Sequence, residues 1–250
     1  YLVFYSFQEK SQDEMVAAIK YLAQQQVTDL VLDLRYNGGG LLSIASQVAY
    51  MIAGSSTRDK TFYRQIQNSK QPVLEPFPFL DYGLYGLNRD LDLPSLNLSR
   101  VYVLSTGSTC SASEAVINGL RGVDVEVFLI GDTTCGKPYG FYPEDNCGTT
   151  YYTIQLQGAN AKGFGEYSEG FSPSTNDSGK ALVAGCRVSD DINHPLGDTN
   201  EAILAKALYY REHGTCGSAV TRSQQKTQGI PDAGELLMPE ARKVLVLDVN

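Results

Sequence analysis

Twice in this chain, a short apolar run leads through a loop of small residues directly into a helical pattern. The first run covers residues 27–34 and is followed by three glycines, and the second covers residues 101–104 and is followed by Thr106-Gly-Ser-Thr-Cys-Ser-Ala-Ser-Glu114. Short, mostly apolar runs are typical of strands buried in a parallel sheet. Strands that alternate with helices favour a layered α/β core. The sequence therefore predicts an α/β fold.

The remaining elements follow from local patterns. Ser11 and Glu14 have the spacing of a capping box, which predicts an amphipathic helix over residues 12–26. Further helices are expected at residues 41–52, from Glu114 to about Leu120, and at residues 200–210, the last with Thr199 as its N-cap. Other strands are expected at residues 1–7, 61–66, 125–131 and 149–156, the last paired antiparallel with the residues after Gly163.

The chain of 250 residues fits one large domain. We expect the core to cover residues 1–212, with a loop-rich insert at residues 54–98. We expect residues 213–250 to be a polar tail and residues 241–249 to be a short strand that pairs with a sheet edge.

Charge and hydropathy exclude several function classes. The net charge of −8 disfavours nucleic acid as a partner. No uninterrupted apolar run approaches the roughly 18 residues of a membrane span. The chain opens on a strand-like run, without an initiator Met or a signal-peptide pattern, so we interpret it as a mature form or an excised fragment.

Five cysteines are present, and none forms a CxxC pair, so we expect no metal site. Five cysteines without a metal pattern indicate an oxidising compartment. Spacing does not fix their connectivity. Our prediction pairs Cys135 with Cys147 and Cys186 with Cys216, and leaves Cys110 free.

Two glycine-containing loops suggest chemistry. The three glycines after Asn37 allow a backbone to approach a ligand closely, although a tight turn explains them equally well. Residues 131–137 match the start of a phosphate-binding loop, but Pro138 stands where a magnesium-binding hydroxyl is needed, which disfavours a nucleotide site. Lys137 then remains a lysine among uncharged neighbours. If it is buried, its pKa falls and it becomes a candidate general base.

The second small-residue loop offers four serines as nucleophiles: Ser105, Ser108, Ser111 and Ser113. A serine needs a base for activation. One route uses His194, which has carboxylates nearby at Asp190 and Asp191, in a Ser–His–Asp arrangement. The other route uses Lys137. His213 lies near a helix end, where a structural role is expected.

Residues 30–42, the Ser111-Ala-Ser-Glu114 motif and Gly136-Lys137, in this order, resemble the C-terminal processing (tail-specific) serine peptidases. The resemblance covers about residues 1–212 and looks like an extracytoplasmic bacterial branch. It implies a ClpP/crotonase-like core of stacked ββα units with a small extra β/loop subdomain. It also implies a serine endopeptidase without a cofactor, periplasmic or secreted, that acts on peptide or protein substrates near their C-termini through an acyl-enzyme.

The resemblance also implies residue roles, which we carry over motif by motif. Ser111 is the expected nucleophile, Lys137 the general base and Glu114 the assisting acidic residue. The expected oxyanion donors are the backbone N–H groups of Gly39 and Ala112, and Gly38 and Gly40 are expected to contact substrate.

The chain departs from the family pattern in three places. The separation of Ser111 and Lys137 is about one residue longer than usual. Phe141 stands where many members have a glutamine that orients the lysine. No PDZ-like stretch is found, so we expect that domain to be missing from this chain, and the oligomeric state stays open. Two other interpretations are a non-catalytic peptide- or lipophile-binding module of the same fold and, ranked last, a crotonase-like acyl-CoA enzyme.

Overall fold

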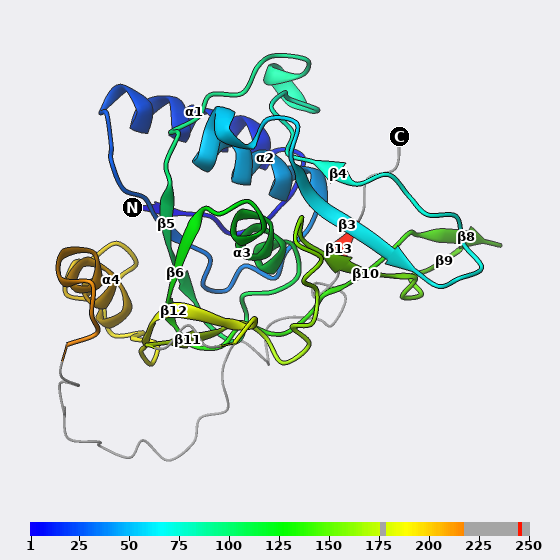
Figure 1. The fold of residues 1–250 in the computed structure, drawn as a ribbon. Helices are drawn as coiled ribbons and strands as arrows, with labels where there is room; N and C mark the ends of the chain where they lie inside the picture. Colours follow the sequence, from blue (N-terminus) through cyan, green and yellow to red (C-terminus); the bar gives the residue numbers. More distant parts are fainter. Residues whose placement is uncertain (176–178, 218–244, 247–250) are drawn as a thin grey trace.

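A computed structural model describes residues 1–175, 179–217 and 245–246 (Figure 1). Its core is a six-stranded sheet in the order β1-β2-β5-β6-β12-β11, in which every neighbouring pair is parallel. The strands are β1 Leu2–Val3, β2 Val31–Asp33, β5 Arg100–Ser105, β6 Glu126–Gly131, β11 Ser172–Ser174 and β12 Leu182–Arg187. The predicted α/β class with a parallel sheet is confirmed.

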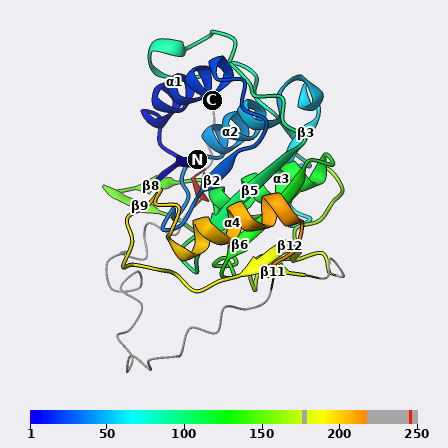
Figure 2. The same ribbon diagram turned by 90° about the vertical axis from the view of Figure 1, so that its left-hand side faces the viewer.

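Both faces of this sheet are buried, which explains the mostly apolar runs. Along β5, Val101 and Val103 belong to the larger core cluster, whereas Tyr102 and Leu104 belong to a smaller cluster on the opposite face. The larger cluster packs against α1 Ser11–Gln24, α2 Leu42–Ala53 and α3 Ala112–Gly122, and the smaller one packs against α4 Ala202–His213 (Figure 2). The sheet is therefore the middle layer between two helical layers.

A second sheet lies beyond α3, in the order β13-β7-β10-β3-β4. Its strands are β3 Thr61–Gln67, β4 Phe77–Pro78, β7 Tyr139–Phe141, β10 Leu156–Ala159 and β13 Leu245–Val246. Helix α3 contacts β6 on one side and β3 and β10 on the other, so it is enclosed between the two sheets (Figure 1). A hairpin of β8 Glu144–Asn146 and β9 Thr149–Tyr151 projects from this part, and two short 3-10 helices, η1 Gly54–Thr57 and η2 Gly86–Asn88, complete the elements.

Two predicted helix caps are wrong. Helix α1 begins at Ser11 with Lys10 as its N-cap residue, and the Ser11 hydroxyl donates to Ser6 O at 2.9 Å rather than capping the helix. At α4 the Glu201 carboxylate, not Thr199, accepts the first free N–H groups. In both cases the backbone turns into the helix at a position that the side-chain pattern alone does not define.

The predicted antiparallel partner of residues 149–156 is also wrong. Residues 149–151 pair with β8, and β10 pairs with β3 and β7 instead of with residues after Gly163. Strands β3 and β4, in the predicted insert, are therefore part of the second sheet. Of the predicted terminal strand, Leu245–Val246 pairs parallel with β7, and its other residues lie outside the described ranges.

The topology brings three loops to one edge. Strands β2, β5 and β6 are consecutive and parallel in the sheet, so their carboxyl ends lie side by side. Ligands of open α/β sheets bind at this kind of edge. The glycine loop follows β2, the serine loop follows β5, and the loop with Lys137 follows β6. Within the described part of the chain, no helix has the length and apolar character to cross a membrane.

Candidate active site

Ser111 occupies the turn between β5 and α3. It is the N-cap residue of α3, with φ 58° and ψ −110°. A residue with a side chain rarely adopts such a conformation, which costs about 1–3 kcal/mol unless surrounding contacts impose it. The residue is 1% exposed. Its Oγ faces the backbone N–H of Glu114 in a capping box, but no partner lies within hydrogen-bonding geometry of this oxygen among the described residues. A buried hydroxyl without a partner is costly, so this oxygen is available for an interaction that forms only when another group binds.

Glu114 joins the serine loop to the lysine loop. Its Oε1 accepts hydrogen bonds from Thr134 Oγ1 at 2.6 Å and from Gly136 N at 2.8 Å. Its Oε2 accepts from Ser111 N at 2.9 Å and from Lys137 N at 2.8 Å. Complete burial raises the pKa of the Glu114 carboxyl, and the four donors oppose that rise by stabilising the carboxylate. One carboxylate oxygen therefore binds the backbone of both Ser111 and Lys137.

Lys137 is half-buried, one residue before the buried Pro138. Burial lowers the pKa of its amine to about 8, although the nearby charge of Glu114 raises it in part. The amine nitrogen lies 5.7 Å from the centre of the Phe141 ring. Phe141 is the residue that stands where the resemblance leads us to expect a glutamine. A substantial fraction of this lysine is neutral near pH 8, as a general base requires.

Gly39 lies directly against the serine turn. Its φ is +102°, and a Cβ added there would lie 2.8 Å from Ser111 Cβ and 2.9 Å from Ala112 N. Ala112 is the first residue of α3, so its N–H has no acceptor inside the helix. The N–H of Gly39 itself donates to Asn37 Oδ1 at 3.0 Å. The absence of a side chain at Gly39 thus lets the glycine loop pack closely against the N-terminus of α3.

The other two glycines differ in their surroundings. Gly38 is half-exposed. Gly40 forms a bridge with Phe7, and a Cβ there would lie 2.1 Å from Phe7 O. Gly40 therefore packs against the N-terminal segment, although it is partly exposed like Gly38.

Asn37 and Thr134 support this site, and sequence reasoning did not select either of them. The Asn37 amide donates to Phe4 O at 2.7 Å, and its backbone oxygen accepts from Cys110 N and from Ser113 Oγ, each at 3.0 Å. Thr134 donates to Glu114 and accepts from Phe171 N at 2.8 Å. The position of Asn37 directly before three glycines was the sequence feature that could have identified it as a site residue. Nothing in the sequence marks Thr134 over its neighbours.

The disulfides differ from the prediction in one pair. Cys186 is bonded to Cys216, as predicted, but Cys110 is bonded to Cys135, and Cys147 is free and exposed. The predicted Cys135–Cys147 pair is wrong because Cys147 lies in the turn of the projecting β8–β9 hairpin, whereas the β5 and β6 loops are neighbours.

The same two cysteines belong to the one group with metal-ligand geometry in the described ranges. The ligand atoms of Cys110, Glu114 and Cys135 lie within 4.8 Å of one another. Metal ions bind cysteine as the thiolate. Since the two sulfur atoms are bonded to each other, this group offers no thiolate in the oxidised protein.

Within the described part of the chain, neither histidine forms a hydrogen bond with a serine. His194 Nδ1 lies 2.8 Å from Asp191 Oδ2, next to the start of α4. His213 Nδ1 lies 2.9 Å from Tyr209 O, and its ring stacks on the Tyr209 ring. The contacts of these residues give a Ser–His–Asp arrangement no support.

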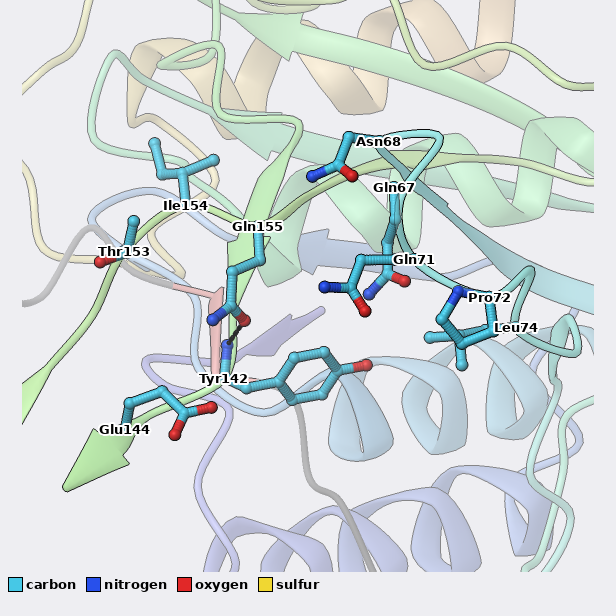
Figure 3. A pocket seen from close by; sticks show the side chains of 10 residues that line it. All are labelled: Gln67, Asn68, Gln71, Pro72, Leu74, Tyr142, Glu144, Thr153, Ile154 and Gln155. Carbon is cyan, nitrogen blue, oxygen red and sulfur yellow. Dashed lines mark hydrogen bonds between the residues drawn. The ribbon is translucent and has the colours of Figure 1, made fainter.

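A cavity of about 750 Å³ opens beside the second sheet (Figure 3). Side-chain amides dominate its lining, together with Tyr142 and Glu144; they belong to Gln67, Asn68, Gln71 and Gln155. Tyr142 N donates to Gln155 Oε1 at 2.9 Å. Because Tyr142 directly follows β7, which begins two residues after Lys137, the cavity is one short strand away from the lysine loop.

The family model of peptidase family S41 matches residues 1–140. Among solved structures, a protein assigned to the S41 proteases from Bacteroides fragilis NCTC 9343 is 26% identical, with a TM-score of 0.67, over 85% of this chain and 54% of that protein. The photosystem II D1 C-terminal processing protease is 22% identical, with a TM-score of 0.50, over 69% of this chain and 40% of that protein.

A lipoprotein from Streptococcus agalactiae is 13% identical, with a TM-score of 0.50, over 66% of this chain and 57% of that protein. The last two likenesses concern the fold alone. This chain spans about half the length of these proteins. No curated protein matches it significantly.

Proposed function

Because this chain belongs to peptidase family S41, we propose that it is a serine endopeptidase in which Ser111 and Lys137 hydrolyse peptide bonds through an acyl-enzyme. One observation carries this proposal. The backbone nitrogens of both residues donate to the same oxygen of Glu114, at 2.9 and 2.8 Å, so the expected nucleophile and base belong to one buried junction. The half-buried state of Lys137 supports the role of the base.

The reaction begins with the neutral amine of Lys137. It accepts the proton of Ser111 Oγ as this oxygen attacks the carbonyl carbon of the substrate peptide. The protonated lysine then donates to the leaving amine, which breaks the peptide bond and leaves an acyl-serine. Water attacks this ester while Lys137 again serves as the base, and the released product restores the free serine. Glu114 holds the two loops in position and contacts the backbone of both residues.

The oxyanion of the tetrahedral intermediate is proposed to bind Ala112 N–H. This group lies at the N-terminus of α3, where the helix dipole favours negative charge. Gly39 contributes by allowing the glycine loop to lie directly against this helix N-terminus. For Gly39 N–H to act as a second donor, it must exchange its bond to Asn37 Oδ1 for one to the substrate. Gly38 and Gly40 are proposed to present backbone groups to the peptide.

Ser111 is 1% exposed, so a substrate carbonyl reaches its Oγ only after neighbouring side chains move aside. We expect labelling by small reagents to be faster than the turnover of large proteins for this reason. The two disulfides fit an extracytoplasmic location, since such bonds persist in oxidising compartments. A preference for substrate C-termini is the part of the proposal that rests on the family resemblance, and peptides with free and blocked C-termini test it.

The decisive experiment is labelling with a small fluorophosphonate, followed by peptide mapping. We expect the label on Ser111 in the unaltered protein, none in Ser111→Ala, and slower labelling in Lys137→Ala because the hydroxyl is no longer activated. Ser108→Ala, in the same loop, is the matched control and should label at the original rate. Equal labelling of Ser111→Ala and the unaltered protein would reject Ser111 as the nucleophile. A complete lack of labelling would favour a non-catalytic module that keeps this fold.

A further inference from the structure

The Cys110–Cys135 disulfide connects the two loops that carry the proposed catalytic residues. Cys110 directly precedes Ser111, and Cys135 lies two residues before Lys137. The Cα atoms of the two cysteines are 5.2 Å apart. Apart from this bond, the loops are joined by the chain itself, which runs through α3 and β6 over a sequence separation of 25. The bond therefore shortens the path between nucleophile and base to a few residues.

We propose that this disulfide is a redox-sensitive clamp that keeps Ser111 and Lys137 in their working positions, so that peptidase activity requires its oxidised state. The inference rests on the proposed Ser–Lys function. It goes beyond that function, because a Ser–Lys mechanism needs no cysteine.

The backbone around Ser111 needs such a constraint. Its φ of 58° is unfavourable for a residue with a side chain, so the surrounding structure must hold it there. Cys110 N donates to Asn37 O and Cys135 N donates to Thr109 O, each at 3.0 Å, and the disulfide lies between these two bonds. The bridge thus fixes the turn beside Glu114, whose carboxylate lies within 4.8 Å of both sulfur atoms.

Reduction would place two thiols where one bond now holds the sulfur atoms together. Unbonded sulfur atoms must separate to van der Waals contact, and Cys135 Sγ already lies 3.5 Å from Glu114 Oε2. That oxygen is the one that binds both Ser111 N and Lys137 N. Separation of the thiols therefore acts directly on the Glu114 oxygen that holds the serine and lysine loops in their relative positions.

The bridge is open to attack from one side. Cys110 is buried, but Cys135 is only partly buried, so a thiolate can attack the Cys135 sulfur. A dithiol reductant supplies two electrons and two protons: a mixed disulfide forms first, its second thiol then closes the oxidised reductant, and Cys110 and Cys135 are released as thiols. Oxidation by a disulfide oxidant reverses the step.

The second disulfide, Cys186–Cys216, is the internal control. It joins the end of β12 to the segment after α4, and neither cysteine has a hydrogen bond to the catalytic loops in the described ranges. Cys147 is replaced by serine in all variants, because this exposed free thiol could otherwise exchange with the bridges.

The experiment measures peptide hydrolysis against pH in oxidised and reduced protein, with thiol mapping of each sample. We expect Cys110→Ala/Cys135→Ala to lower kcat about 100-fold, the size of effect that a misplacement of about 1 Å produces. The acid limb of its pH profile should move to higher pH, because a loosened loop exposes Lys137 to water and restores its ordinary pKa. Reductant should have no further effect on this variant.

Cys186→Ala/Cys216→Ala should keep its activity when oxidised, lose it on reduction, and recover it on reoxidation. This variant also tests the clamp if the first one does not fold, because its Cys110–Cys135 bridge can be reduced after folding. An unchanged kcat and pH profile after reduction of that bridge, shown by thiol mapping, would overturn the clamp. Ser111→Ala separates this from a failure of the underlying function: full hydrolysis by that variant would overturn the Ser–Lys assignment and the clamp with it.

Discussion

The regions before and after β7 differ in how their polar side chains are buried and hydrogen-bonded. Before β7 lies the junction around Glu114, where a fully buried carboxylate accepts four hydrogen bonds from the serine and lysine loops. After β7 lies the cavity beside Tyr142, where amides such as Gln71 face solvent (Figure 3). The difference indicates that the first region fixes chemistry and the second adapts to what binds.

The physical reason lies in the cost of movement. A buried donor that loses its acceptor costs about 1–3 kcal/mol, so the groups around Glu114 stay in place. An exposed amide exchanges a water for another polar group at little net cost. Changes at the junction should therefore affect kcat, and changes in the cavity should affect KM.

The largest effect is expected at the base. Lys137→Ala removes the group that accepts the serine proton, and we expect kcat to fall about 10³-fold, within the range typical for general bases. Lys20→Ala, an exposed lysine of α1, is the control and should leave kcat unchanged. Steady-state peptide hydrolysis measures both. A loss of less than about tenfold in Lys137→Ala would place the base elsewhere.

Gly39→Ala should lower kcat about 10²-fold, since a methyl group there would lie 2.9 Å from Ala112 N and must displace the proposed oxyanion donor. Gly163→Ala is the matched control, because Gly163 also has a positive φ, +80°, but has no atom within 4 Å of an added Cβ. Both variants suffer backbone strain, and only Gly39→Ala obstructs the site. Similar kcat losses in both would attribute the effect to strain alone.

Glu114→Gln should destabilise the fold and lower kcat up to about 10²-fold. Its NH₂ group would face N–H donors that now bind a carboxylate oxygen, at a cost of about 2 kcal/mol. The exposed Glu126 of β6 provides the control variant Glu126→Gln. The thermal unfolding temperature and kcat should both fall in Glu114→Gln. Neither quantity should change in Glu126→Gln. A normal kcat would show that the junction does not position the catalytic pair.

The pH dependence should show the state of Lys137. Below its pKa of about 8 the amine is protonated and cannot accept the serine proton, so kcat/KM should fall about tenfold per pH unit on the acid side and level off above pH 8. A profile with an apparent pKa near 6.5 would instead indicate a histidine base, since this is the ordinary pKa of imidazole.

The smallest effect is expected in the cavity. Gln71→Ala removes an exposed amide from its lining, and we expect KM to rise only a few-fold, about what a loss of roughly 1 kcal/mol produces, with kcat unchanged. Gln24→Ala, on the exposed end of α1, is the control. A change in kcat rather than KM would contradict the separation of the two regions.

Much of the fold was accessible from the sequence because local patterns encode it. Residues 27–34 are mostly apolar and residues 101–104 place apolar or aromatic side chains on both strand faces, which predicts a sheet covered on two sides. The helix caps at Ser11 and Thr199 were predicted wrongly, since capping depends on where the backbone turns, and this is set by packing of the preceding segment. The partner of β10 was predicted wrongly for a similar reason. Its neighbours β3 and β7 are distant in sequence or separated by a hairpin, and their pairing depends on the assembly of the whole second sheet.

By itself, the sequence determined the parallel α/β core, the serine loop at the start of a helix and a lysine with few charged neighbours. The tertiary structure decided three further contacts. Cys110 is bonded to Cys135, Asn37 Oδ1 accepts a hydrogen bond from Gly39 N, and Glu114 Oε2 accepts hydrogen bonds from both Ser111 N and Lys137 N. The Cys110–Cys135 disulfide and the hydrogen bond from Lys137 N to Glu114 join different loops, 25 and 23 positions apart in the chain. They form because β2, β5 and β6 lie side by side, and strand order is a property of the assembled sheet, to which no single stretch of sequence refers.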